Sequence, residues 1–153
     1  MDLSTAGIKF AWATETTSGT KPSSFTALPG AKSIPEINSE PATLETTSLD
    51  ATVWKTYVAG LKDLGGALGI TFNDNDQFQT AWANFKASYD AGKTENKATW
   101  IEVYIPNMTK GFFMTVDVTE LGFGGAEVDS VLENTGYIVP TGNIGWATAI
   151  VPS

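Results

Sequence analysis

The fold is decided by residues 100–119, which read WIEVYIPNMTKGFFMTVDVT. Large apolar and polar residues alternate on both sides of Pro106, which is the period of a half-buried β-strand. The segment 107–111 between them has the composition of a turn, so the stretch predicts an antiparallel hairpin. The side chains expected to face the core in its second half are Phe112, Met114, Val116 and Val118.

The residues before this hairpin predict one helix, over about residues 75–91. Apolar residues from Phe78 to Tyr89 recur at i, i+3, i+4, i+7 and i+11, which places them in one stripe. Capping residues at 73–76 precede the stripe, and Gly92 follows it.

Other β-type segments bring the expected number of strands to about seven. They lie at 8–12, 64–72, 128–133, 136–139 and 143–149, with Pro140 ending the fourth of them. Turn residues dominate 16–33, where we expect a flexible loop, and 122–127 reads as a flexible connection. The predicted fold class is mainly β (α+β): an antiparallel β-sandwich or barrel with one packed helix and extended arms, in a single domain of residues 1–153.

Residues 34–62 leave two structures open. Pro35 and Pro41 exclude a regular helix at the start of this segment. Apolar residues from Leu49 to Leu61 have helix-like spacing, but Gly60 weakens that interpretation. A short helix and a long hairpin excursion both fit.

The composition excludes most catalytic and nucleic-acid-binding chemistry. The 153 residues carry a formal net charge of −8, and all nine basic residues are lysine, so the chain has no arginine, histidine or cysteine. These absences remove disulfides, thiolate nucleophiles, Cys- or His-based metal sites and histidine-containing triads. They also remove bidentate phosphate contacts, and a negative chain is repelled by DNA.

The chain also lacks the usual signals for export or membrane insertion. Its first residues, MDLSTAGIKFAW, have no basic segment before an apolar run, and no stretch approaches the length needed to span a bilayer. We therefore expect the protein to be located in the cytosol, or in a structure that is assembled from cytosolic proteins.

Two local patterns resemble binding motifs but lack their essential residues. Counted from Asp74, an EF-hand loop needs glycine at position six and glutamate at position twelve, where this chain has Gln79 and Phe85. The glycines of 122–125 lack the spacing of a dinucleotide fingerprint. We assign no catalytic, cofactor-binding or metal-binding residue, and expect no cofactor.

Two other classes of function remain open on the residues alone. The five tryptophans could include the sugar-stacking platform of a carbohydrate-binding or cell-surface β-sandwich module. Carboxylate pairs such as Glu127 and Asp129 could serve a two-carboxylate hydrolase. With 17 acidic residues in the chain, a solvated surface is the simpler interpretation of such pairs.

The middle of the chain carries a further pattern. It consists of IPEI at 34–37, EPATLETTSLD at 40–50 and KTYVAGLKD at 55–63, followed by FNDND at 72–76. This block resembles the major tail tube proteins of long-tailed bacteriophages.

The resemblance implies a structural virion protein and not an enzyme. Proteins of this family form hexameric rings that stack into a tube, in which the inner sheet of each subunit joins its neighbours. DNA passes through this conduit into the host cell without specific binding. The implied partners are further copies of this chain, the tape measure protein, the tail terminator and baseplate or tip proteins. The implied location is the virion tail, after assembly in the host cytoplasm.

The resemblance also gives candidate contact residues. Residues 34–62 become an inter-ring loop, with Leu44, Leu49, Trp54 and Tyr57 as its candidate contacts. Residues 111–153 hold five acids and no lysine, and a wall of carboxylates and small hydroxyls would let phosphates slide past. The candidate lumen-facing residues are Thr115, Asp117 and Thr119.

Overall fold

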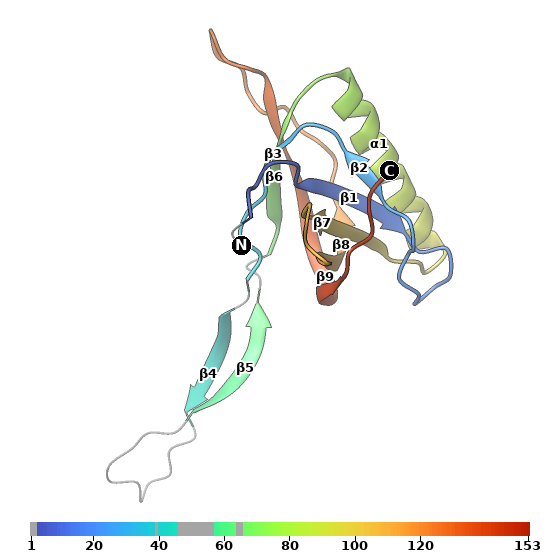
Figure 1. The fold of residues 1–153 in the computed structure, drawn as a ribbon, viewed down its shortest axis with the longest axis vertical. Coiled ribbons are helices and arrows are strands. Elements are labelled where there is room, and N and C mark those ends of the chain that lie inside the picture. The colour runs from blue at the N-terminus through green and yellow to red at the C-terminus, as the bar shows by residue number, and fades with distance from the viewer. Residues whose placement is uncertain (1–2, 39, 46–56, 64–65) are drawn as a thin grey trace, which may run out of the picture. The chain divides into compact units, whose positions relative to one another are not determined.

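The computed structural model describes residues 3–38, 40–45, 57–63 and 66–153. They form two compact units (Figure 1). The larger unit comes from residues 1–35 and 67–153, and the smaller from residues 36–66.

The larger unit is built on one antiparallel seven-stranded sheet in the order β2-β1-β7-β8-β9-β6-β3. Its strands are β1 (Lys9–Thr14), β2 (Thr26–Leu28), β3 (Ala31–Ser33), β6 (Leu68–Asn73), β7 (Thr99–Tyr104), β8 (Lys110–Val118) and β9 (Glu133–Thr148). The predicted hairpin is confirmed, because β7 and β8 pair from Thr99↔Val116 to Val103↔Phe112. The predicted mainly-β class with one helix is confirmed as well.

The predicted helix is confirmed as α1 (Asp76–Thr94), which packs on one face of the sheet. The side chain of Asn75 caps its start by accepting a hydrogen bond from the backbone N–H of Phe78. An aromatic stripe then packs against the sheet: Trp12 stacks on Phe85, and Phe72 contacts both Phe78 and Trp82.

Gly136 makes room for the side chain of Trp82. A Cβ at Gly136 would lie 2.4 Å from the Trp82 ring, so only glycine permits this approach. The Trp82 indole N–H donates to the carbonyl oxygen of Thr119 at 3.0 Å, so its polar atom is paired as well.

The opposite face of the sheet is also covered. Phe25, Trp100 and Phe113 form a second core cluster there with alanines of β1, and Ile150 packs against it from the last residues of the chain. Burial on both faces means that β8 does not have the polar side its sequence pattern predicts. Of the residues expected to face the core, Met114, Val116 and Val118 are buried and Phe112 is half-buried, but Phe113 and Thr115 are buried too.

The strand predictions after residue 120 are wrong in two respects. Residues 128–133 were expected to be a strand, but 128–132 belong to the connection between β8 and β9. Pro140 was expected to end a strand, but β9 runs through it without interruption. The ladder between β8 and β9 is irregular beside Pro140, and β6 does not reach that far, so the missing N–H breaks no pair there.

The expected loop over 16–33 contains two short strands, β2 and β3, near its end. These strands are only three residues long, which is below the length at which a period-two pattern becomes visible.

In the smaller unit, the described residues pair as the two strands of a hairpin, which is the second of the two structures open for residues 34–62; residues 46–56 lie outside the described part. Strand β4 (Glu40–Glu45) pairs antiparallel with β5 (Tyr57–Asp63), from Glu40↔Asp63 to Glu45↔Tyr57.

Candidate assembly surfaces

The second half of β9 presents a free strand edge. β6 pairs with β9 only from Glu133 to Ile138, whereas β8 pairs with it from Ile138 to Thr148. On the β6 side, residues 139–148 therefore pair with no strand of the described part of the chain. Such an edge offers its N–H and C=O groups to another strand.

An apolar patch accompanies this edge. Ile144 and Trp146 are alternate residues of β9 and are 44% and 52% exposed. Trp146 meets the ring of its cross-strand partner Phe112 edge-on, with 5.4 Å between the centroids. We call Phe112, Ile144 and Trp146 the β9 patch. An exposed aromatic with neighbouring apolar side chains is typical of interfaces.

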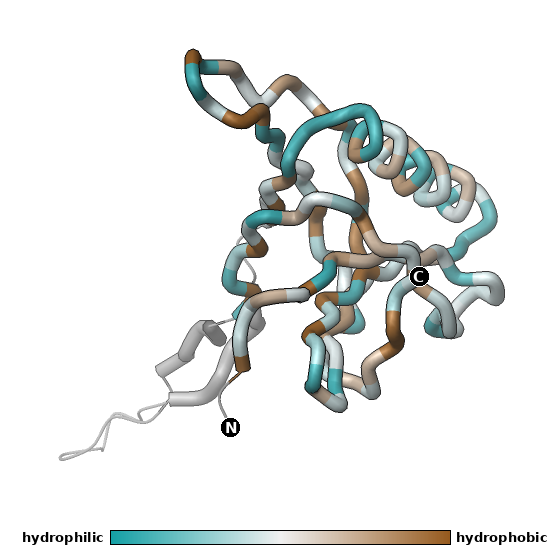
Figure 2. The backbone as a smooth tube through the Cα atoms, turned by 45° about the horizontal axis from the view of Figure 1, so that its top comes forward, coloured by the Kyte–Doolittle hydropathy of each residue, from teal (hydrophilic) through white to brown (hydrophobic). Residues whose placement is uncertain are grey.

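The connection between β8 and β9 carries a second group of exposed apolar side chains. Phe123, Val128 and Val131 are 76%, 90% and 69% exposed. Brown apolar positions are visible on this loop in Figure 2, where it stands out from the sheet. Its two ends are anchored, because Asn134 donates to the carbonyl oxygen of Gly122 and the Asp74 N–H donates to that of Leu132.

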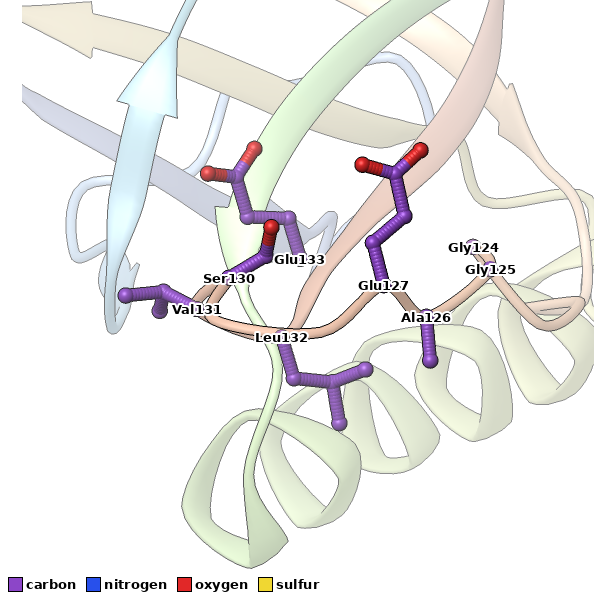
Figure 3. A pocket seen from close by; sticks show the side chains of 8 residues that line it. All are labelled: Gly124, Gly125, Ala126, Glu127, Ser130, Val131, Leu132 and Glu133. Carbon is purple, nitrogen blue, oxygen red and sulfur yellow. The ribbon is translucent and has the colours of Figure 1, made fainter.

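This loop encloses a hollow of about 480 Å³, lined entirely by residues 124–127 and 130–133. In Figure 3, Glu127, Ser130 and Glu133 extend to one side of the loop, and Ala126 and Leu132 to the other. The carboxylate of Glu133 is paired with Lys32. With Glu133 paired, Glu127 and Ser130 are the polar side chains left to the hollow, and we assign no ligand to it.

The three candidate lumen residues do not share one surface. Thr115 is 3% exposed and donates to the carbonyl oxygen of Gly142. Thr119 is half-buried and donates to the carbonyl oxygen of Tyr137, so both threonines tie β8 to β9. Asp117 is exposed and accepts a 2.9 Å hydrogen bond from the Tyr89 hydroxyl of α1. Burial, with the Asp117 hydrogen bond and charge, raises the pKa of Tyr89.

Two of the candidate inter-ring contacts lie in the hairpin of the smaller unit. Leu44 lies in β4 opposite Val58, and Tyr57 begins β5 opposite Glu45. The other two, Leu49 and Trp54, lie outside the described residues.

Sequence reasoning missed two buried carboxylates. Burial alone would raise the pKa of Glu15, but hydrogen bonds from the Trp100 indole and the backbone N–H groups of Ala98 and Gly19 outweigh it and hold the pKa below its usual value. Glu102 is 0% exposed, and its Oε2 accepts from the Ile150 N–H at 3.0 Å.

The second carboxylate is the less well satisfied of the two. Among the residues that the structure describes, Glu102 Oε1 has no hydrogen-bond partner. Burial raises the pKa of Glu102, against the opposing effects of the Ile150 N–H and the Lys21 charge. Glu102 occupies a polar position of the alternating run WIEVYI, and it is buried because the last residues of the chain cover the second face of the sheet.

The described residues give no support to the other two function classes. Among the four tryptophans that the structure describes, only Trp146 is exposed, so no platform of stacked rings forms there. Glu127 and Asp129 lie in the exposed loop. In the same part of the chain, no group of three His, Cys, Asp or Glu side chains could hold a metal ion. No helix that the structure describes is long and apolar enough to cross a membrane.

Comparison with known proteins places the fold. No family model and no curated protein sequence matches the chain. Solved structures do match it over nearly its whole length. A chain in the tail of an empty GTA particle, computed with C6 symmetry, has a TM-score of 0.61 and 13% identity, with 96% of this chain and 100% of that one covered.

Two further structures agree. A chain of the six-fold symmetrised baseplate of the anti-feeding prophage gives a TM-score of 0.59 at 9% identity, covering 97% of this chain and 98% of that one. A chain of the sheath–tube complex of an extracellular contractile injection system gives 0.53 at 12% identity, covering 97% and 93%. The resemblance to tail tube proteins is thus confirmed at the level of the fold, which this chain shares almost end to end with components of a GTA tail and of contractile injection systems.

Proposed function

We propose that this chain is a structural subunit of a tail tube, which assembles into hexameric rings that stack into a hollow conduit. One observation carries the proposal: the fold matches, over nearly the full chain, subunits of assemblies with six-fold symmetry. The role is mechanical and not enzymatic.

The free edge of β9 supports lateral contacts within such a ring. A closed ring pairs strand edges that a lone subunit leaves exposed, which removes the association hazard of an open sheet. The β9 patch adds apolar area beside that edge. The free edge and the β9 patch together allow one copy to bind another through both backbone hydrogen bonds and apolar side-chain contacts.

The hairpin of residues 36–66 supports contacts between rings. An isolated two-stranded hairpin is marginally stable in water, so its strands need a partner surface. We propose that this unit reaches an adjacent ring, with Leu44, Leu49, Trp54 and Tyr57 among its contacts.

The acidic last third of the chain supports a lumen that does not bind DNA. Residues 111–153 contain five acids and no lysine, so a wall made from them repels phosphates. Asp117 is exposed and available for such a wall, whereas Thr119 is half-buried and would contribute only part of its surface. Thr115 is buried in the single subunit. Its hydroxyl would therefore contribute indirectly, by holding β8 to β9, the strands that form this part of the wall.

The proposed partners follow from the same role. A tape measure protein would occupy the lumen during assembly, and a terminator and a baseplate would bind the two ends of the tube. The proposed location is the virion tail, after assembly in the host cytoplasm.

Electron microscopy of the purified chain tests this proposal. Concentrated protein should form rings of six-fold symmetry or uniform hollow tubes. A protein that stays monomeric at all concentrations would contradict the proposal. Its retention on a polysaccharide column would in addition favour the carbohydrate-binding alternative.

A further inference from the structure

The last residues of the chain cover the edge of β2. β2 is an outer strand of the sheet and pairs on one side with β1. On its other side, the Ser153 N–H donates to the carbonyl oxygen of Phe25 at 3.0 Å, and the Ala27 N–H donates to the carbonyl oxygen of Ser153 at 3.2 Å. This is the bonding pattern of a parallel strand placed opposite Thr26. Figure 1 shows the chain end beside β2.

The segment that reaches this edge, Ala149–Ser153, is here called the strap. Its first residue donates a backbone hydrogen bond to Thr109, and the Ile150 N–H donates to Glu102 Oε2. The Ile150 side chain packs on the second core cluster, and Pro152 is buried. The strap is therefore docked along its length, although it forms no regular structure of its own.

One of the hydrogen bonds that hold the strap is made to a group that is costly to bury. The strap's anchor on β7 is a fully buried carboxylate, one oxygen of which has no hydrogen-bond partner in the described part of the chain, and burial disfavours its charged form. The Val151 side chain is 71% exposed and adds little packing. A short segment at the edge of a sheet, with Val151 and Ser153 exposed, opens at a lower free-energy cost than a core strand.

We propose that in the free subunit the strap occupies the place at the β2 edge that a strand of a second copy of this chain takes in a ring. The strap leaves the β2 edge when a ring forms. The inference rests on the proposed tube function. A ring of head-to-tail contacts requires two different surfaces on each copy. The β9 edge at residues 139–148 is already free, whereas the β2 edge is occupied by the strap, so the strap keeps the free subunit from pairing at both edges.

A reversible cross-link tests this role. Thr26→Cys combined with Ser153→Cys places two thiols on backbones that pair as neighbouring strands, about 4.8 Å apart, within the span of a disulfide. The chain has no cysteine of its own, so the engineered pair is the only one present. The oxidised double variant should sediment as a monomer at concentrations where the reduced variant forms rings or tubes. The two single-cysteine variants are matched controls and should assemble in either redox state.

Removal of residues 151–153 tests the same inference from the opposite direction. Assembly of the shortened chain no longer requires two backbone hydrogen bonds to break, so its critical concentration should fall about tenfold. Circular dichroism and a cooperative unfolding curve establish that the shortened chain is folded.

The outcomes separate the inference from the proposed function. If the oxidised variant assembles as readily as the reduced one, the strap inference is wrong while the tube function stands. If neither the wild type nor the shortened chain ever forms rings or tubes, both are wrong. Assembly of the shortened chain alone would support both.

Discussion

Replacing Trp146 with serine should weaken assembly without unfolding the subunit. Trp146 is the largest member of the β9 patch and is 52% exposed. A fully covered tryptophan buries up to about 250 Å², so roughly 130 Å² remain for a partner to cover. At about 25 cal/mol per Å² this area is worth at most about 3 kcal/mol. Incomplete coverage and ordering costs reduce the expected loss to about 1.5 kcal/mol per contact, or about tenfold in affinity.

The assay is the critical concentration for ring or tube formation, followed by light scattering and sedimentation. Trp146→Ser should raise it at least about tenfold. The loss of the edge-on contact with Phe112 should lower the subunit's own free energy of unfolding by only about 1 kcal/mol.

Tyr137→Ser is the matched control. Tyr137 is 51% exposed on the same strand, but it lies where β9 is paired with β6, away from the free edge. An unchanged critical concentration for the Trp146 variant, or an equal rise for both variants, would refute the assignment of the β9 patch as a subunit contact.

Three further predictions concern the subunit itself and are measured by denaturant unfolding. Gly136→Ala should lower the free energy of unfolding by about 1–3 kcal/mol, because the added methyl overlaps the Trp82 ring; an unchanged midpoint would show that the ring can move aside. Asn75→Ala should lower it by about 1 kcal/mol through loss of the helix cap, and Asn75→Asp should restore it. Because the pKa of Glu102 is raised in the folded state, its contribution to stability is greatest below the usual glutamate pKa and declines as the pH rises through the folded-state pKa. Glu102→Gln should remove that decline, and a pH profile identical to the wild type would contradict the assignment.

The helix and the central hairpin were predictable because their signals are local. The stripe from Phe78 to Tyr89 and the cap at Asn75 depend only on neighbouring residues, and the helix observed at Asp76–Thr94 follows them closely. The alternation on both sides of Pro106 likewise depends on nothing outside the hairpin.

The remaining features depend on distant segments. Thr115 and Glu102 lie on the polar side of their alternating patterns, and they are buried because loop 16–25 and the strap cover that face. The continuation of β9 through Pro140 depends on where β6 ends, which no local pattern in 133–148 encodes. The free β9 edge, and with it the candidate assembly surface, could therefore be found only from the three-dimensional structure.

Electron microscopy of particles formed by the purified chain, at a resolution that traces the strands, shows directly whether β9 binds a second copy. We expect hollow six-fold rings or tubes in which β9, at residues 139–148, is covered by the neighbouring copy. Particles of another symmetry, or rings in which that edge remains open to solvent, would contradict this expectation.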